Sequence, residues 1–151
     1  MSKLQTPFRY DFVGSFLRPQ VLKDAKAAYR EGKITKEAFD KVADEEITKV
    51  VAKQKELGFH AITDGEFRRT FWHLDFMWGF DGVAHENTGN GVKFDAELAV
   101  LDDTYLVGKI KAKAHPFVEY FKFLKQFEDE NTVAKYTIPA PAQTFQKMIV
   151  P

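Results

Sequence analysis

The sequence contains no cysteine, and this absence excludes several kinds of chemistry. Its 151 residues can form no disulfide framework, no thiol nucleophile and no thiolate ligand for a metal. Neither sign of charge is in excess, because 22 Lys and Arg side chains balance 22 Asp and Glu side chains. A balanced charge without a Lys/Arg-rich run argues against an electrostatic nucleic-acid binder.

Long apolar runs and several well-known motifs are also missing. Residues 1–8 lack the apolar core of a signal peptide, and no run of about 18 apolar residues occurs anywhere. The absence of P-loop, GxGxxG and GxSxG motifs argues against nucleotide binding and serine-hydrolase chemistry. We therefore expect a cytoplasmic protein that binds neither a membrane nor nucleic acid.

What is present is an alternation of short apolar runs with longer helical patterns. Apolar residues at helical spacing predict helices that start at Pro19, after Thr35 and at Pro116. Short apolar runs bounded by turn residues predict strands over residues 10–16, 59–63 and 133–138. Strands separated by helices are typical of parallel pairing, so the sequence predicts an α/β fold.

Residues 70–115 interrupt this alternation. Residues 71–80 (FWHLDFMWGF) are dense in aromatic side chains, and residues 92–98 alternate apolar with polar side chains. Residues 104–112 are the expected hairpin partner of residues 92–98, across Asp102 and Asp103. We therefore expect an inserted antiparallel hairpin excursion.

The number of strands sets an expectation about the architecture. A (β/α)8 barrel needs about 250 residues. Here only three predicted parallel strands, with their helices and the hairpin excursion, already occupy the 151 residues. Residues 1–151 are therefore predicted to be the N-terminal portion of a partial TIM barrel, with its first three parallel strands. A small open α/β sheet is the alternative.

Candidate site residues follow the predicted parallel strands, where barrels place their chemistry. Ser15, after Gly14, offers a hydroxyl and a backbone N–H to a carboxylate, and Glu66 can accept hydrogen bonds from an ammonium group. Arg18 can pair with a ligand carboxylate or, like Arg68 and Arg69, with Asp64 and Glu66. Residues 64–66 also fit a turn with a local ion pair.

The histidines and aromatic residues allow two interpretations each. His73 is the best functional candidate, whereas His60 is expected in the core, His115 at a helix cap and His85 at the surface. No pair has the spacing of a helical zinc site. The aromatic residues of segment 71–80 can form a stacking wall for a flat ligand, although packing is the commoner use.

Two motifs together resemble a known family. Residues 13–19 (VGSFLRP) followed by residues 62–69 (ITDGEFRR) are similar to the cobalamin-independent methionine synthase family, and to its short single-barrel members above all. Residues 72–76 (WHLDF) and 115–118 (HPFV) are similar to the same subgroup.

The resemblance implies a zinc-dependent methyltransferase of methionine biosynthesis. Such an enzyme transfers a methyl group from a methylated folate to homocysteine and gives methionine. The resemblance places the amino-acid carboxylate on the backbone of Val13, Gly14 and Ser15, and the ammonium group on Glu66. Arg18 and His73 are further substrate-binding candidates, and no catalytic residue is assigned.

The resemblance also implies zinc ligands, one His, one Glu and two Cys, on later strands of the complete barrel. We therefore expect zinc for the complete family barrel but none for this chain alone, and we expect the fragment to be inactive. An alternative is a non-catalytic binding or assembly module that self-associates through open barrel edges. A third hypothesis is a hydrolase that uses Asp64 and Glu66 as its carboxylate pair.

Overall fold

The computed structural model describes residues 11–89, 91–94, 97–100, 102–143 and 148–149. These residues fall into two compact units. The first unit takes its residues from 1–70 and 120–137, and the second from 71–119 and 138–151.

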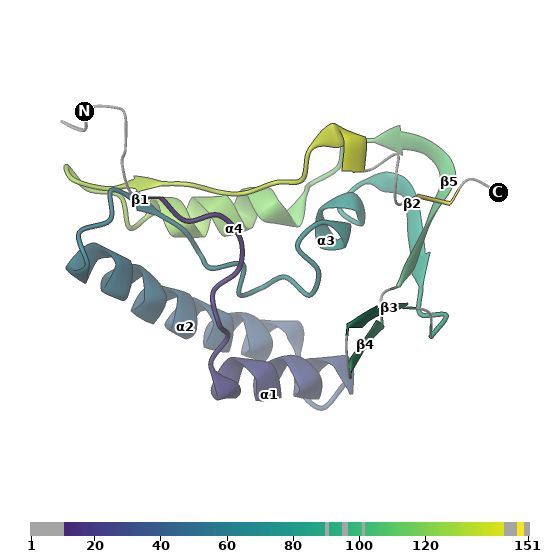
Figure 1. The fold of residues 1–151 in the computed structure, drawn as a ribbon, viewed down its shortest axis with the longest axis horizontal. Helices are drawn as coiled ribbons and strands as arrows, with labels where there is room; N and C mark the ends of the chain where they lie inside the picture. The colour runs from purple at the N-terminus through teal and green to yellow at the C-terminus, as the bar shows by residue number, and fades with distance from the viewer. Residues whose placement is uncertain (1–10, 90, 95–96, 101, 144–147, 150–151) are drawn as a thin grey trace. The chain divides into compact units, whose positions relative to one another are not determined.

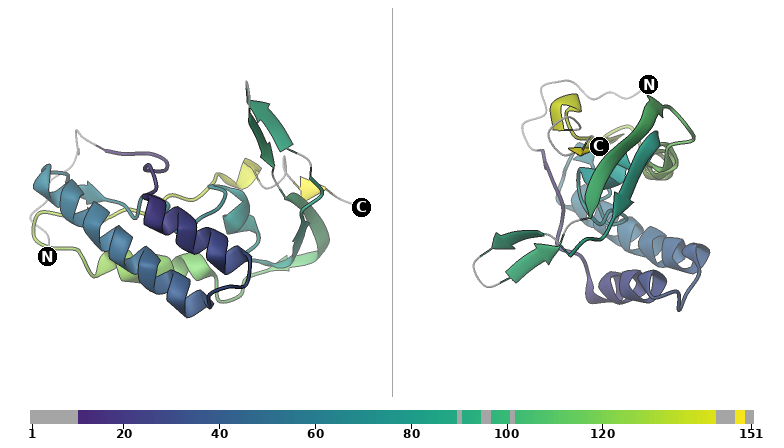
Figure 2. Two further views of the ribbon diagram at one scale, coloured as in Figure 1. Left: turned by 90° about the horizontal axis from the view of Figure 1, so that it is seen from below. Right: turned by 90° about the vertical axis from the view of Figure 1, so that its right-hand side faces the viewer.

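Two helices lie side by side in the first unit, α1 (Gln20–Arg30) and α2 (Lys36–Glu56) (Figures 1 and 2). Pro19 precedes α1, and Thr35 caps α2 by accepting the Ala38 N–H on its Oγ1 at 3.3 Å. Both helices confirm the sequence prediction, because caps and apolar spacing act locally.

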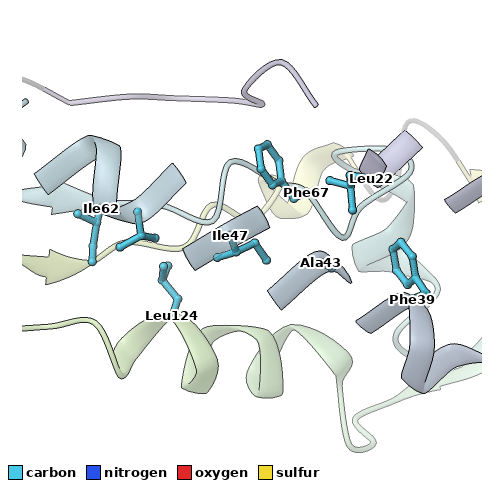
Figure 3. Close-up of a cluster of buried hydrophobic side chains, with 8 residues drawn as sticks. Leu22, Phe39, Ala43, Ile47, Ile62, Phe67 and Leu124 are labelled. Carbon is cyan, nitrogen blue, oxygen red and sulfur yellow. The ribbon is translucent and has the colours of Figure 1, made fainter. Parts of the chain in front are cut away.

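The core of the first unit is built on one face of α2. Four apolar side chains of α2, spaced four residues apart, are buried: Phe39, Ala43, Ile47 and Val51. They pack with four side chains from elsewhere in the unit (Figure 3). Leu22 belongs to α1, Ile62 and Phe67 to the segment that follows α2, and Leu124 to α4 (Pro116–Lys125), the third predicted helix. Burying each large side chain contributes about 1.5–3 kcal/mol, so this face fixes α2 against the rest of the unit.

One parallel strand pair belongs to the same unit. β1 (Ala61–Ile62) pairs with β6 (Val133–Ala134), and the Lys135 N–H donates to the Ile62 carbonyl at 2.9 Å. The parallel pairing of the second and third predicted strands is confirmed, although each strand is shorter than predicted.

The prediction of a strand over residues 10–16 is wrong for the part that the structure describes. Residue 10 lies outside the described part of the chain, and residues 11–16 form no strand. Gly14 has φ +94°, which interrupts the extended run. The Phe16 N–H donates to the carbonyl of Gly65 at 3.1 Å, so this segment attaches to a loop rather than to the strand ladder. The three predicted strands therefore do not form one parallel sheet among the described residues.

The second unit is mostly antiparallel. It contains a short helix α3 (Leu74–Met77) and a long ladder between β2 (Asp81–Glu86) and β5 (Asp103–Lys111), seen in Figure 2. A separate hairpin joins β3 (Gly91–Phe94) to β4 (Glu97–Val100), and β5 also pairs in parallel with β7 (Met148–Ile149).

The antiparallel pairing confirms the expectation for this stretch, but the predicted partners are wrong. β5, which covers most of residues 104–112, pairs with β2. Of the expected partner, residues 92–94 belong to β3 and residues 97–98 to β4, and residues 95–96 lie outside the described residues. Beyond the end of β2, the Thr88 hydroxyl donates to the Asp103 carboxylate at 2.6 Å, a contact that the alternating pattern does not reveal. Gly82 permits the irregularity in this ladder, since its φ is +81° and a Cβ would lie 2.6 Å from the Lys109 carbonyl oxygen.

Among the helices of the described residues, none combines the length and the apolar character that a bilayer crossing requires.

Candidate functional site

The candidate site centres on the segment that follows β1, residues 63–69, here called the 63–69 loop. Its seven residues (TDGEFRR) are all buried. Five of them are polar or charged, with exposed fractions of 1–9%: Thr63, Asp64, Glu66, Arg68 and Arg69. Buried polar groups are costly unless they are hydrogen-bonded, so the contacts of this loop decide its conformation.

The backbone of the loop is fixed by its neighbours. Gln54 of α2 donates to the Thr63 carbonyl at 2.8 Å and accepts the Thr63 N–H at 2.9 Å. The Asp64 carboxylate then accepts the Glu66 N–H at 2.9 Å. Gly65 cannot carry a side chain here, because its φ is +63° and a Cβ would lie 2.8 Å from the ring of Phe16.

Glu66 itself adopts a left-handed conformation with φ +58°. For a residue with a Cβ this conformation costs about 1–2 kcal/mol. Such strain persists only where surrounding contacts enforce it, and it is common at functional sites. The strained backbone therefore singles out Glu66 as the candidate functional residue of this loop.

The Glu66 carboxylate gathers donors from distant parts of the chain. Oε2 accepts the Ser15 hydroxyl at 2.5 Å, across 51 positions of sequence. Oε1 accepts the Thr137 hydroxyl at 2.8 Å, across 71 positions, and lies 3.3 Å from Nη1 of Arg69. Three segments thus converge on one buried carboxyl group, which accepts hydrogen bonds on both of its oxygens.

Positive side chains hold the backbone beyond Glu66. Arg18 donates to the carbonyl oxygens of Glu66 and Arg69 at 3.0 and 3.1 Å, and Lys26 donates to that of Arg69 at 2.5 Å. Arg18 thus lies beside Glu66, but it bonds backbone carbonyl groups. The expected local ion pair forms between Glu66 and Arg69, while Arg68 pairs with Asp44 instead.

Asp64 has a different environment from Glu66. Burial raises the pKa of the Asp64 carboxyl above its ordinary value, although its bond from the Glu66 N–H and the nearby Arg69 oppose that shift. The pKa of the neighbouring Tyr136 hydroxyl is raised as well, by burial and by the charge of Asp64. Asp64 and Glu66 therefore have different surroundings, although they are only two residues apart.

The structure brings together three of the predicted site residues: Ser15, Arg18 and Glu66. Val13 is 87% exposed, and Gly14 supplies the positive φ just before Ser15. His73 belongs to the second unit, where it is buried and precedes α3, with its ring centroid 4.5 Å from that of Trp72.

The other three histidines have mixed outcomes. His60 was expected in the core, which is wrong, because it is exposed and its Nδ1 lies 2.9 Å from the Asn131 carbonyl oxygen. His115 precedes α4 as expected, and its Nδ1 accepts the Phe117 N–H at 3.2 Å. His85 is at the surface as expected, stacked on Trp78 with ring centroids 3.8 Å apart.

The aromatic residues of segment 71–80 mainly pack against one another and their neighbours. The Phe76 ring contacts those of Phe80, His115 and Phe117, and Trp78 contacts Phe71 edge-on. Packing is therefore the observed use of Phe76, Phe80 and Trp78. Trp72 is the exception, because 48% of it is exposed.

Three residues of the site were missed at the level of sequence: Gln54, Lys26 and Thr137. Gln54 sits on the apolar face of α2, and that position was the available signal for a buried amide. Thr137 lies near the carboxyl end of the predicted strand 133–138. The carboxyl ends of parallel strands lie at one edge of a sheet. That rule was the signal that Thr137 and the 63–69 loop would meet.

The described residues do not fit the zinc site that the family resemblance implies. They contain no group of three or more His, Cys, Asp or Glu side chains placed to hold a metal ion. The sequence also offers no cysteine thiolate.

Comparisons with known proteins agree with the motifs. Residues 9–97 match the family model described as the catalytic domain of cobalamin-independent synthase. The chain belongs to the cobalamin-independent methionine synthase family. The resemblance predicted from residues 13–19 and 62–69 is thereby confirmed.

Two individual proteins are similar to different shares of the chain. YxjH, an uncharacterized protein of Bacillus subtilis, is 38% identical over 141 residues, which are 93% of this chain and 37% of YxjH. A 5-methyltetrahydropteroyltriglutamate–homocysteine methyltransferase of Thermotoga petrophila is 34% identical over 77 residues, 51% of this chain and 10% of that protein.

A solved structure supports the same assignment. The putative vitamin-B12 independent methionine synthase of Listeria monocytogenes superposes with a TM-score of 0.79 at 39% identity, over 99% of this chain and 41% of that chain. The α/β fold of this chain is therefore similar to part of a methionine synthase. The chain spans well under half the length of YxjH and of the Listeria protein.

Proposed function

We propose that this chain supplies the amino-acid-binding part of a methyltransferase that converts homocysteine to methionine with a methylated folate as donor. In this proposal, residues 1–151 form the N-terminal portion of a TIM barrel. Family membership and the likeness to the Listeria structure support it. The observation that carries it is the contact between the Ser15 hydroxyl and the Glu66 carboxylate, at 2.5 Å.

The chemistry of that contact suits the two charged groups of an amino acid. Glu66 offers a buried carboxylate for the α-ammonium group, and such charge-assisted bonds are about twice as strong as neutral ones. Ser15 offers a hydroxyl for the α-carboxylate, beside the backbone of Val13 and Gly14. Holding both groups orients the side chain of homocysteine, so that its thiol is presented in one direction.

Calorimetric titration with L-homocysteine and L-methionine tests the proposal. We expect the wild-type chain to bind both amino acids and Glu66→Gln to bind them about 10- to 100-fold more weakly, because a bond to a charged group is lost. Glu56→Gln, at the exposed end of α2, is the matched control and is expected to bind as the wild type does. Equal binding by wild type and Glu66→Gln would remove Glu66 from the site.

A further inference from the structure

The two oxygens of the Glu66 carboxylate have partners of different kinds. Oε1 is held by Thr137 and Arg69, and Arg69 is 1% exposed. Oε2 accepts the hydroxyl of Ser15, a residue that is exposed at the surface. One oxygen is thus bound by Thr137 and a buried guanidinium group, and the other by the hydroxyl of an exposed residue.

The groups on Oε1 are themselves fixed. Arg69 Nη2 donates to the Thr137 carbonyl at 2.5 Å, so Glu66, Arg69 and Thr137 close a ring of hydrogen bonds. The Arg69 guanidinium also lies 4.7 Å from the ring centroid of Tyr136. At the other end of the residue, Lys26 holds the Arg69 carbonyl. Such a ring restricts rotation of the Glu66 carboxylate about its last bond.

We propose that Thr137 and Arg69 are positioning residues that reserve Oε1 of Glu66 for the protein and leave Oε2 for the α-ammonium group of the amino acid. The incoming ammonium group replaces the Ser15 hydroxyl on Oε2. The released hydroxyl then donates to the α-carboxylate of the same ligand. This inference rests on the proposed function, because it assumes an amino-acid ligand at Glu66.

Thr137→Val tests the role of Thr137, since valine keeps the shape of threonine and removes the hydroxyl. The two probes are L-methionine and 4-(methylsulfanyl)butanoate, which is the same molecule without its α-amino group. We expect Thr137→Val to bind L-methionine about tenfold more weakly and the deaminated probe unchanged. Thr137→Ser retains the hydroxyl and should restore the wild-type ratio of the two affinities.

The ratio separates positioning from general stability. Thr48→Val is the matched control, because Thr48 is exposed and its hydroxyl donates to the Asp44 carbonyl of the same helix, α2. If Thr137→Val weakens both probes equally, or neither, the positioning role is wrong. If the wild-type chain binds neither L-methionine nor L-homocysteine, it is the proposed function that fails first.

Ser15→Ala provides a second measurement that leaves the buried ring intact. The probe is 3-(methylsulfanyl)propan-1-amine, which carries the ammonium group but no carboxylate. Without a competing hydroxyl on Oε2, Ser15→Ala should bind this amine about threefold more tightly than the wild type does. Unchanged or weaker binding would overturn the exchange between Ser15 and the ligand.

Discussion

The 63–69 loop and the aromatic segment 71–80 are close along the chain but are stabilised in different ways. In the loop, the buried Glu66 carboxylate bonds hydroxyl groups that are 51 and 71 positions away. In the aromatic segment, rings pack on nearby rings and on two histidines of the second unit. Packing spreads its energy over many small contacts, whereas a buried charge depends on a few specific partners. Candidate ligand chemistry therefore lies in the loop.

The largest effect should come from removing a charge in the loop. Arg69→Met leaves the Glu66 carboxylate buried without its cation, which should lower the free energy of unfolding by about 3–5 kcal/mol. Urea unfolding of the full chain measures this loss. Arg30→Met, at the exposed end of α1, is the control and should change stability by about 0.5 kcal/mol or less. A loss at Arg69 as small as that of the control would contradict the comparison.

A steric change tests the aromatic segment. A Cβ at Gly79 would lie 2.1 Å from Nε2 of His115, so Gly79→Ala should cost about 1–3 kcal/mol through forced repacking. Combining it with His115→Ala should cost less than the sum of the single changes, because the clash is gone. Gly108→Ala is the control, since its nearest neighbour would be at 3.8 Å. Additive losses in thermal unfolding would show that the two sites do not interact.

A smaller effect is expected from Asp64, through the pH dependence of the free energy of unfolding. Because burial raises the pKa of Asp64, the folded chain holds that proton more tightly than the unfolded chain does. The contribution of Asp64 to stability is therefore present at low pH and falls as the pH rises from about 3.9, the ordinary aspartate value, through the raised one. Asp64→Asn, which keeps an oxygen for the Glu66 N–H, should lose this dependence.

Unfolding of both proteins from pH 4 to pH 7 measures the effect. Relative to wild type, Asp64→Asn should gain stability as the pH rises. A difference that stays constant, or that changes in the opposite direction, would contradict the raised pKa.

The smallest effect is expected at the surface of the second unit. His85 lies 2.8 Å from the Asp102 carboxylate and stacks on Trp78. His85→Ala should cost about 0.5–1 kcal/mol, as exposed pairs and ring contacts do. A double-mutant cycle with Asp102→Asn isolates the coupling between the two side chains. A coupling above about 2 kcal/mol would mean that this pair behaves like the buried ones of the loop.

The sequence by itself determined the helices and the family. The Thr35 cap and the four-residue spacing from Phe39 to Val51 specify α2, because both signals act within one element. The motifs around Ser15 and Glu66 identified the family without any structural information. The polar residues that follow the predicted strands also named Ser15 and Glu66, which meet at the site.

Only the tertiary structure decided which distant groups meet. The pairing of β2 with β5, the absence of a strand over residues 11–16 and the exposure of His60 all depend on long-range contacts. Thr137 became part of the site because the β1–β6 pair brings its segment beside the 63–69 loop. Local patterns encode periodicity and caps, but a buried carboxylate is satisfied by whichever donors the fold delivers, and no spacing in the sequence records that.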